Sequence, residues 1–186
     1  PNIGLLSDEF LEDIKNLPHR NLAMELLEKL LRDEIKARMK TDVVSEMKYS
    51  DRIMETLRKY HNRAIETAQV IEELIALAKE MEEDLAQAEK LGLNPDEISF
   101  YRALIQNESA VRELGDNNLR DLARYITEQL RKSTTVDWQV RDSVRAKLRN
   151  LVRRALRKWK YPPDKADEAI ELCLKQAEAL SQSWSV

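Results

Sequence analysis

The sequence has few of the residues that interrupt helices. It contains three glycines and five prolines among 186 residues, and only 5% of its residues are aromatic, whereas 35% are charged. Sheet proteins need frequent turns and strands rich in aromatic and β-branched residues, so this composition predicts an all-α protein. A chain of this length can bury roughly 70% of its unfolded surface. We therefore expect a single helical domain over residues 1–186.

Cysteine and long apolar runs are also scarce. Cys173 is the only cysteine, which excludes an internal disulfide and a cysteine-rich zinc site and is typical of a reducing, cytoplasmic compartment. No run of about 18 uncharged apolar residues exists, and the amino terminus lacks a signal-peptide pattern, so no membrane partner is expected. Because the first residue is Pro1 rather than Met, we expect a fragment of a longer chain or a processed product.

Patterns that carry catalysis are missing. Gly4, Gly92 and Gly115 cannot form a phosphate-binding loop, and neither histidine belongs to a Glu-x-x-His pair of the kind found in di-iron bundles. Cys173 lies on the apolar stripe of the last expected helix, which predicts a buried structural thiol rather than a nucleophile. We predict no catalytic residue, no metal ligand and no cofactor for this chain.

Apolar periodicity predicts an irregular bundle of six to eight helices around one long central helix. The long helix is expected from Asp51 to Leu91, where no glycine or proline occurs and apolar residues recur every three or four positions. The tail over residues 181–186 is expected to fray, with Trp184 as its anchor. The other expected helices cover about residues 8–17, 21–40, 95–105, 116–132, 137–159 and 163–180.

Charge is distributed unevenly along the chain. Eleven basic and two acidic residues lie between Arg131 and Lys160, which gives this segment a net charge of +9. The whole chain has a net charge of −3, so the other residues together carry −12. Arginines at every fourth position of the basic helix over residues 139–160 can contact successive DNA phosphates. Alternatively, they pair with the acidic remainder of the chain, including residues 80–84, or with another subunit. The candidate DNA-binding residues are Arg141, Arg145, Arg149, Arg153, Arg154 and Arg157.

A polar cluster interrupts the apolar stripe of the expected long helix at Tyr60, His61, Asn62 and Arg63. Asn62 and Arg63 either pair with a neighbouring helix and fix its register or belong to an interface with another domain or subunit. If they form an interface, we expect nearby polar positions of the same helix to join it. The candidate interface residues are Asn62, Arg63, Gln69, Glu72 and Glu73.

The pattern Tyr-x-Asn-Arg-x-Ile-x-Thr-Ala-Gln-Val-Ile-Glu-Glu-Leu-Ile begins at Tyr60. Five further segments belong with it: residues 21–27 (NLAMELL), 107–111 (NESAV), 136–138 (VDW), 145–149 (RAKLR) and 161–165 (YPPDK). Together these segments resemble the carboxy-terminal helical region of type I restriction enzyme R (restriction, motor) subunits, in the order of that family and over nearly the whole chain.

The resemblance implies a role in assembly. In this family, a magnesium-dependent nuclease domain and an ATP-driven translocase domain precede the helical region, and none of their motifs occurs in this chain. No catalytic residue can therefore be carried over, and ATP and magnesium are expected only for the parent subunit, an ATP-dependent site-specific deoxyribonuclease. The resemblance implies that this region packs on the motor domains and docks the subunit to the methyltransferase subunit.

Overall fold

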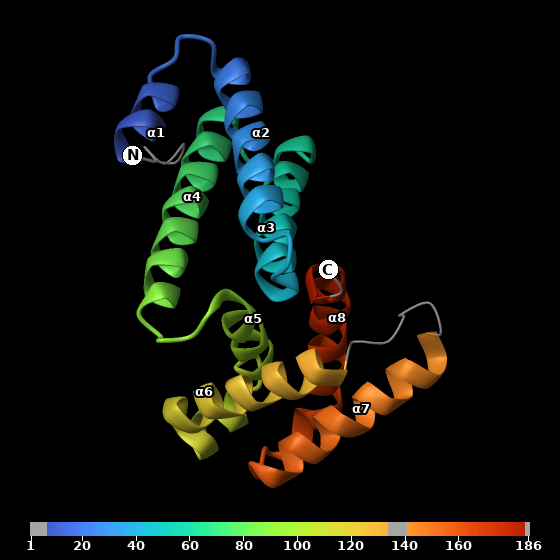
Figure 1. The fold of residues 1–186 in the computed structure, drawn as a ribbon. Coiled ribbons are helices and arrows are strands. Elements are labelled where there is room, and N and C mark those ends of the chain that lie inside the picture. Colours follow the sequence, from blue (N-terminus) through green and yellow to red (C-terminus); the bar gives the residue numbers. More distant parts are fainter. Residues whose placement is uncertain (1–6, 134–140, 185–186) are drawn as a thin grey trace. The chain divides into compact units, whose positions relative to one another are not determined.

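The computed structural model describes residues 7–133 and 141–184, and this part of the chain is helical without any strand (Figure 1). The predicted all-α class is therefore confirmed. The described elements are eight α-helices and one short 3-10 helix, η1. Their bounds are α1 (Asp8–Lys15), α2 (Arg20–Arg38), α3 (Val43–His61), α4 (Thr67–Glu89), α5 (Pro95–Leu104), α6 (Glu108–Ser133), α7 (Arg141–Lys158), η1 (Pro163–Lys165) and α8 (Ala166–Trp184).

The chain divides into two compact units, a division that the sequence analysis did not anticipate. Unit 1 comprises residues 1–40 and 45–89, and unit 2 comprises residues 41–44 and 90–186. The buried apolar residues form two separate clusters that follow the same division. The single domain stays a prediction, and it requires the two units to unfold together.

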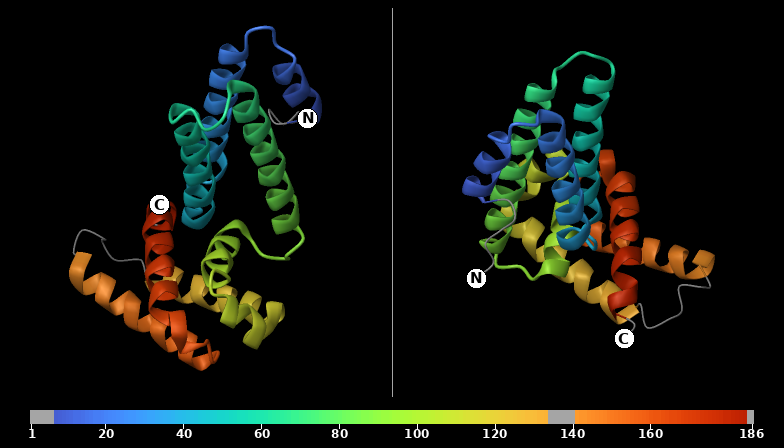
Figure 2. Two further views of the ribbon diagram at one scale, coloured as in Figure 1. Left: turned by 180° about the vertical axis from the view of Figure 1, so that it is seen from behind. Right: turned by 90° about the horizontal axis from the view of Figure 1, so that it is seen from above.

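Unit 1 is built on the packing of α2 against α4, with α1 beside both. The two helices run side by side in both views of Figure 2. Its core includes Leu27 and Leu31 from α2, Leu74 and Met81 from α4, and Tyr49 from α3, all without measurable exposure. The apolar residues of α2 are only partly buried, because Leu22 is 56% exposed and Leu26 is 37% exposed.

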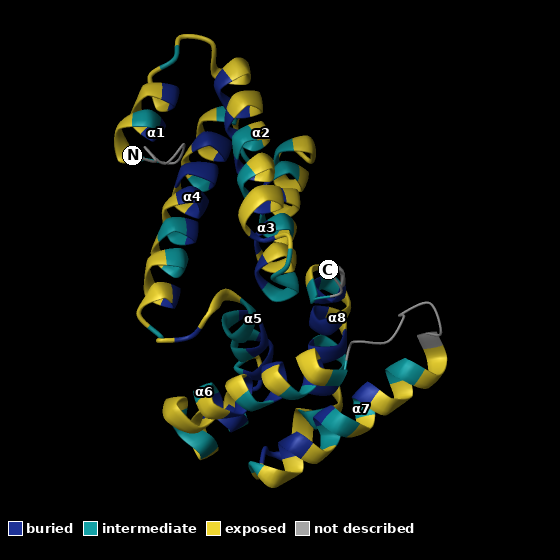
Figure 3. Ribbon diagram, viewed as in Figure 1, coloured by how far each residue is buried: buried dark blue, intermediate teal, exposed yellow. Residues whose placement is uncertain are grey.

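Unit 2 packs α5 against α6 and α8, and α7 against α6 and α8. Phe100, Leu122, Leu148 and Cys173 come from these four helices and are fully buried in one cluster. Figure 3 shows the buried residues of α7 along one side of the helix and exposed residues along the other. The helix is therefore held by one face and presents the opposite face to solvent.

The predicted long helix from Asp51 to Leu91 is wrong, because α3 ends at His61 and α4 begins at Thr67. Arg63 adopts a positive φ of 60°. The Ala64 N–H donates to the Lys59 carbonyl (2.8 Å) and the Arg63 N–H donates to the Tyr60 carbonyl (3.0 Å). This pair of bonds is the Schellman motif, which normally has glycine at the position of Arg63. The sequence contains no glycine here, so the helix end could not be read from it.

A second Schellman motif ends α7 with lysine at the corresponding position. Lys160 has a φ of 57°, its N–H donates to the Arg157 carbonyl (3.1 Å), and the Tyr161 N–H donates to the Leu156 carbonyl (2.8 Å). The described residues thus include this helix-ending motif in both units, each time with a basic residue in the left-handed conformation that favours glycine.

Two other predicted helix starts, at residues 8 and 95, are confirmed. Ser7 accepts the Phe10 N–H at the start of α1 (3.3 Å), and Asn94 and Glu97 form a reciprocal capping box at the start of α5. Within residues 181–184 the helix is intact, because α8 continues as far as Trp184, and residues 185–186 lie outside the described residues. The indole of Trp184 stacks on Phe100 and donates to a carboxylate of α5, so the end of the helix is anchored.

Within the described residues, no helix combines the length and the apolar character needed to cross a membrane.

Candidate interaction surfaces

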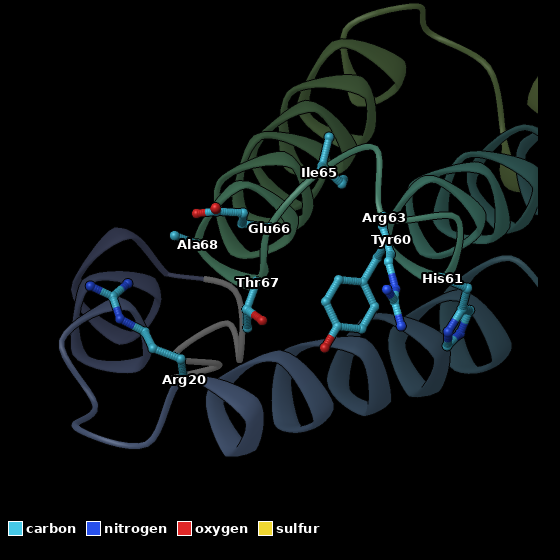
Figure 4. Close-up of a pocket in the computed structure, with 8 residues that line it drawn as sticks. All are labelled: Arg20, Tyr60, His61, Arg63, Ile65, Glu66, Thr67 and Ala68. Atoms are coloured by element: carbon cyan, nitrogen blue, oxygen red, sulfur yellow. The ribbon is translucent and has the colours of Figure 1, made fainter.

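The turn between α3 and α4 borders an open hollow of about 830 Å³ in unit 1 (Figure 4). Tyr60 and Thr67 approach the hollow from the two helices, while Arg20 lies at the start of α2. The rings of Tyr60 and His61 are 5.6 Å apart. The hollow is lined by Arg20, Tyr60, His61, Arg63, Ile65, Glu66, Thr67 and Ala68.

Three of the predicted interface residues in unit 1 have exposed side chains without a hydrogen bond or ion pair to another described residue. Asn62 and Arg63 occupy the turn after α3, and Glu72 lies on the outer side of α4. These three side chains are therefore free to contact a partner, as far as the described residues show. The alternative in which Asn62 and Arg63 pair with a neighbouring helix and fix its register therefore finds no support in this structure.

The other two predicted interface residues have partners within unit 1. Gln69 accepts the Glu66 N–H through its side chain (3.0 Å), which satisfies a free backbone donor at the start of α4. Glu73 accepts the hydroxyl of Thr56 (2.9 Å) and lies 3.8 Å from the Lys59 ammonium. Gln69 thus caps the start of α4, whereas Glu73 connects α4 to α3.

The basic helix α7 lies against α8, and two of its six predicted DNA-binding residues form ion pairs there. Arg149 donates to Glu171 through two nitrogens, at 2.7 and 3.1 Å. Arg145 lies 3.5 Å from both Glu171 and Glu178. Intramolecular pairing, one of the two alternatives from the sequence, therefore holds for these two arginines, although their partners are on α8 and not within residues 80–84.

The electrostatics of Glu171 follow from this arrangement. Partial burial pushes the pKa of its carboxyl upward, but the hydrogen bonds and positive charges of Arg149 and Arg145 outweigh burial and lower the pKa overall. The carboxylate is therefore held in its charged form between two guanidinium groups. Glu171 was not identified from the sequence, because a single acidic residue on an amphipathic helix has no distinguishing pattern.

The remaining predicted DNA-binding arginines lie elsewhere on α7. Arg154 and Arg157 are exposed and Arg153 is half-buried. Arg153 and Arg154 make only long hydrogen bonds, of 3.4 Å, to Asn150. No carboxylate among the described residues pairs with these three arginines. Arg141 is the first residue of α7, and the predicted start of this helix at residues 137–140 lies outside the described residues.

Two segments that carry the family resemblance meet in unit 2. The Asn107 amide (3.3 Å) and the Ser109 hydroxyl (2.8 Å) both donate to the carboxylate of Asp164. These hydrogen bonds, first that from Ser109 and then that from Asn107, lower the pKa of Asp164. The phenol of Tyr161 donates to the buried carbonyl of Leu104 (2.7 Å). Segments 107–111 and 161–165 thus fasten η1 to the start of α6.

A buried glutamine, which the sequence analysis did not single out, fixes the segment over residues 41–44. Gln176 has no measurable exposure, accepts the Val43 N–H (2.9 Å) and donates to the carbonyl of Thr41. Arg102 pairs with Asp42 at 2.9 Å. These contacts explain why residues 41–44 belong to unit 2, although the residues on both sides of them belong to unit 1.

The predicted buried thiol is confirmed. Cys173 has no measurable exposure, and burial raises its pKa to about 12, so the reactive thiolate is not populated near neutral pH. Within the described residues, no cluster of histidine, cysteine, aspartate and glutamate could hold a metal ion.

A comparison with protein families matches residues 1–183 to the family described as "Type I restriction enzyme HindI endonuclease subunit-like, C-terminal". The chain belongs to this family. The resemblance carried by the segments around Tyr60, Asn107 and Tyr161 is thereby confirmed over nearly the whole sequence.

Two named relatives of this type I restriction family are much longer than the chain. The type I restriction enzyme HindI endonuclease subunit of Haemophilus influenzae is 45% identical over 182 residues, which is 98% of this chain but 17% of the relative. A Methanocaldococcus jannaschii protein, provisionally named the type I restriction enzyme MjaIXP endonuclease subunit, is 30% identical over 156 residues, 80% of this chain and 14% of the relative. No solved structure matches the chain.

Proposed function

We propose that this chain is a non-catalytic assembly domain of a type I restriction endonuclease R subunit. In this proposal it packs on the nuclease and translocase domains of the subunit and docks the subunit to the methyltransferase subunit of a cytoplasmic restriction-modification complex. ATP and magnesium would act in the other domains of the parent deoxyribonuclease. The observation that carries the proposal is the family match over residues 1–183, which assigns the chain to the carboxy-terminal region of such subunits.

The geometry of unit 1 supports docking at the α3–α4 turn. Asn62 and Arg63 are exposed and held in place by the Schellman motif, so their positions are fixed before a partner arrives. Leu22 and Leu26 of α2 are large apolar side chains left in solvent, and α2 begins at Arg20 on the rim of the same hollow. Tyr60 and Arg63 both line this hollow, and aromatic residues and arginine are enriched at protein interfaces.

DNA binding by the basic helix was the second function predicted from the sequence. The contacts of α7 argue against DNA binding by all six of its predicted arginines. Arg145 and Arg149 share the carboxylate of Glu171, so using them for phosphates would break ion pairs that already hold α7 to α8. Direct DNA contact by this helix requires other side chains.

The docking proposal is tested by measuring binding of the chain to the methyltransferase subunit of the same type I system by titration calorimetry. The combined substitutions Asn62→Ala and Arg63→Gly remove both exposed side chains, while glycine preserves the backbone conformation of the turn. We expect binding to weaken at least about tenfold, the loss of about 1.4 kcal/mol that one interface arginine can cause.

A matched control is available in the other Schellman motif. Lys160→Gly makes the same kind of backbone change in unit 2 and should leave the affinity unchanged. If the unsubstituted chain fails to bind the methyltransferase subunit, or if the double variant binds as tightly as the unsubstituted chain, docking through this turn is wrong.

A further inference from the structure

The positive charge of α7 divides between two faces of the helix. On the face toward α8, Arg145 and Arg149 are neutralised by Glu171 and Glu178. On the outer side, basic residues lie without a carboxylate partner among the described residues, and we call this set the outer basic face. The outer basic face consists of Lys147, Arg153, Arg154 and Arg157.

The packing of α7 fixes the outer basic face in space. Leu148, Val152, Ala155 and Leu156, which alternate with these residues along the helix, are buried in the core of unit 2. At the carboxy-terminal end, Lys158 lies over the rings of Tyr125 and Trp159, at 4.7 and 5.2 Å from their centroids. Asp142 is the only acidic residue on the helix, and it lies at the opposite end.

The length of the outer basic face fits a phosphate backbone. Lys147 and Arg157 are separated by ten residues, which corresponds to about 15 Å along an α-helix. Each strand of duplex DNA presents a phosphate about every 3.4 Å along the duplex axis, so the face can lie along about four phosphates. Guanidinium groups suit such ligands, because their planar donors match the oxygens of a phosphate.

The outer basic face is less suited to a protein partner. Val144 and Leu151, the large apolar residues that flank it, are packed against the core of unit 2, so the face offers no large exposed apolar anchor. Protein interfaces usually have an apolar or aromatic centre with charged residues at the rim. Rigid, closely spaced cations without such a centre favour a polyanion with regular charge.

We propose that the outer basic face of α7 binds the phosphate backbone of duplex DNA without regard to base sequence. Contacts to phosphates position a protein on DNA but carry no sequence information. This inference does not depend on docking through the α3–α4 turn, because the two surfaces belong to different units and involve different residues.

The test is the salt dependence of binding to two short duplexes of unrelated sequence, measured by fluorescence anisotropy between about 50 and 200 mM salt. For about four neutralised phosphates, the slope of log affinity against log salt should be about −3.6 for both duplexes. The triple variant Lys147→Gln, Arg154→Gln, Arg157→Gln should reduce the magnitude of the slope by about 2.7, at roughly 0.9 for each contact.

Two control variants separate phosphate contact from a general loss of charge or fold. Arg145→Gln with Arg149→Gln removes two positive charges from the face toward α8, and the slope should stay near that of the unsubstituted chain. Arg154→Lys with Arg157→Lys keeps the charge of the outer basic face and should also keep the slope. Circular dichroism of each variant establishes that helical content is retained.

Several outcomes would overturn the inference. These are absence of binding at about 50 mM salt, equal slopes for the triple variant and the unsubstituted chain, or a marked preference for one duplex sequence. Polyglutamate that competes as well as duplex DNA at equal charge would instead identify an acidic protein surface as the partner.

Discussion

The two units of the molecule use charge in opposite ways. In unit 1, the acidic helix α4 receives basic residues from its neighbours: Arg38 pairs with Glu82 at 2.7 Å, and Lys48 and Arg52 pair with Glu80. In unit 2, the basic helix α7 receives acidic residues from α8, and basic residues remain on its outer side. The net charge of a sequence segment therefore does not identify the surface that can bind a charged partner, because ion pairs within the protein neutralise part of that charge.

The largest expected effect concerns whether the two units form one cooperative domain. Leu74→Ala in unit 1 and Leu148→Ala in unit 2 each remove a fully buried side chain and should each lower the free energy of unfolding by about 2–5 kcal/mol. Denaturant unfolding followed by circular dichroism measures both. A single transition that shifts in both variants supports the predicted single domain, whereas two transitions that respond separately would contradict it.

The next effect compares two buried tyrosine hydroxyls. Tyr161→Phe leaves the buried carbonyl of Leu104 without its partner, and we expect a loss of about 1–3 kcal/mol. Tyr49→Phe in unit 1 should cost less, about 1 kcal/mol or below. The reason is that the Asp84 carboxylate, which accepts from Tyr49, is 33% exposed and keeps Lys48 at 3.3 Å. Equal losses in the two variants, measured by denaturant unfolding, would contradict this ranking.

The two Schellman motifs should respond alike to glycine. Arg63→Gly and Lys160→Gly relieve a left-handed backbone conformation that is unfavourable for residues with a Cβ atom, and each should stabilise the chain by about 0.5–1 kcal/mol. Glu55→Gly, at an exposed position inside α3, is the control and should destabilise by about 1 kcal/mol. Thermal unfolding of the three variants measures the signs, and a destabilising effect of Arg63→Gly would contradict this explanation of the turn.

The smallest expected effect is the pH dependence of the ion pairs. In unit 1, hydrogen bonding from Arg52 lowers the pKa of Glu80, and in unit 2 Arg149 and Arg145 lower that of Glu171 against the opposing effect of burial. A carboxyl with a lowered folded-state pKa stabilises the fold above its ordinary value of 4.5, and this contribution is lost as the pH falls through the folded-state pKa.

Both carboxylates are partly exposed, so solvent screening limits each contribution to less than about 1 kcal/mol. Unfolding midpoints of Glu80→Gln and Glu171→Gln, compared with the unsubstituted chain across this acidic range, should show a weaker pH dependence in both variants. An unchanged pH profile in either variant would mean that its ion pair contributes nothing to stability.

The sequence was sufficient to predict the helical class and those helix ends that use residues with strong conformational preferences. Asn94 followed by Pro95 and Glu97 predicts the start of α5, and proline at 162 and 163 predicts the break before α8. The end of α3 could not be predicted, because Arg63 occupies a position that glycine would have marked. The division into two units was also hidden, since Gln176 reaches residues 41–44 across more than 130 positions of sequence.

The residues of the candidate surfaces could be predicted from the sequence, but the residues with which they form ion pairs could not. Spacing alone placed Arg145, Arg149, Arg153 and Arg157 on adjoining positions of one helix, yet the first two face Glu171 and the others do not. Which side of an amphipathic helix meets an acidic neighbour depends on how that neighbour packs. That packing is determined by tertiary contacts between α7 and α8 and leaves no local signature.

Because the single cysteine is buried, its reactivity can be used to measure local opening of the core around it. Cys173 lies in the core of unit 2, and unit 1 contains no cysteine. A thiol-specific reagent can reach it only when that core opens, so the rate of labelling in native buffer measures the opening of unit 2 alone. Because Cys173 does not react in the folded protein, a cysteine introduced on the surface would be labelled selectively with a fluorophore at one chosen position.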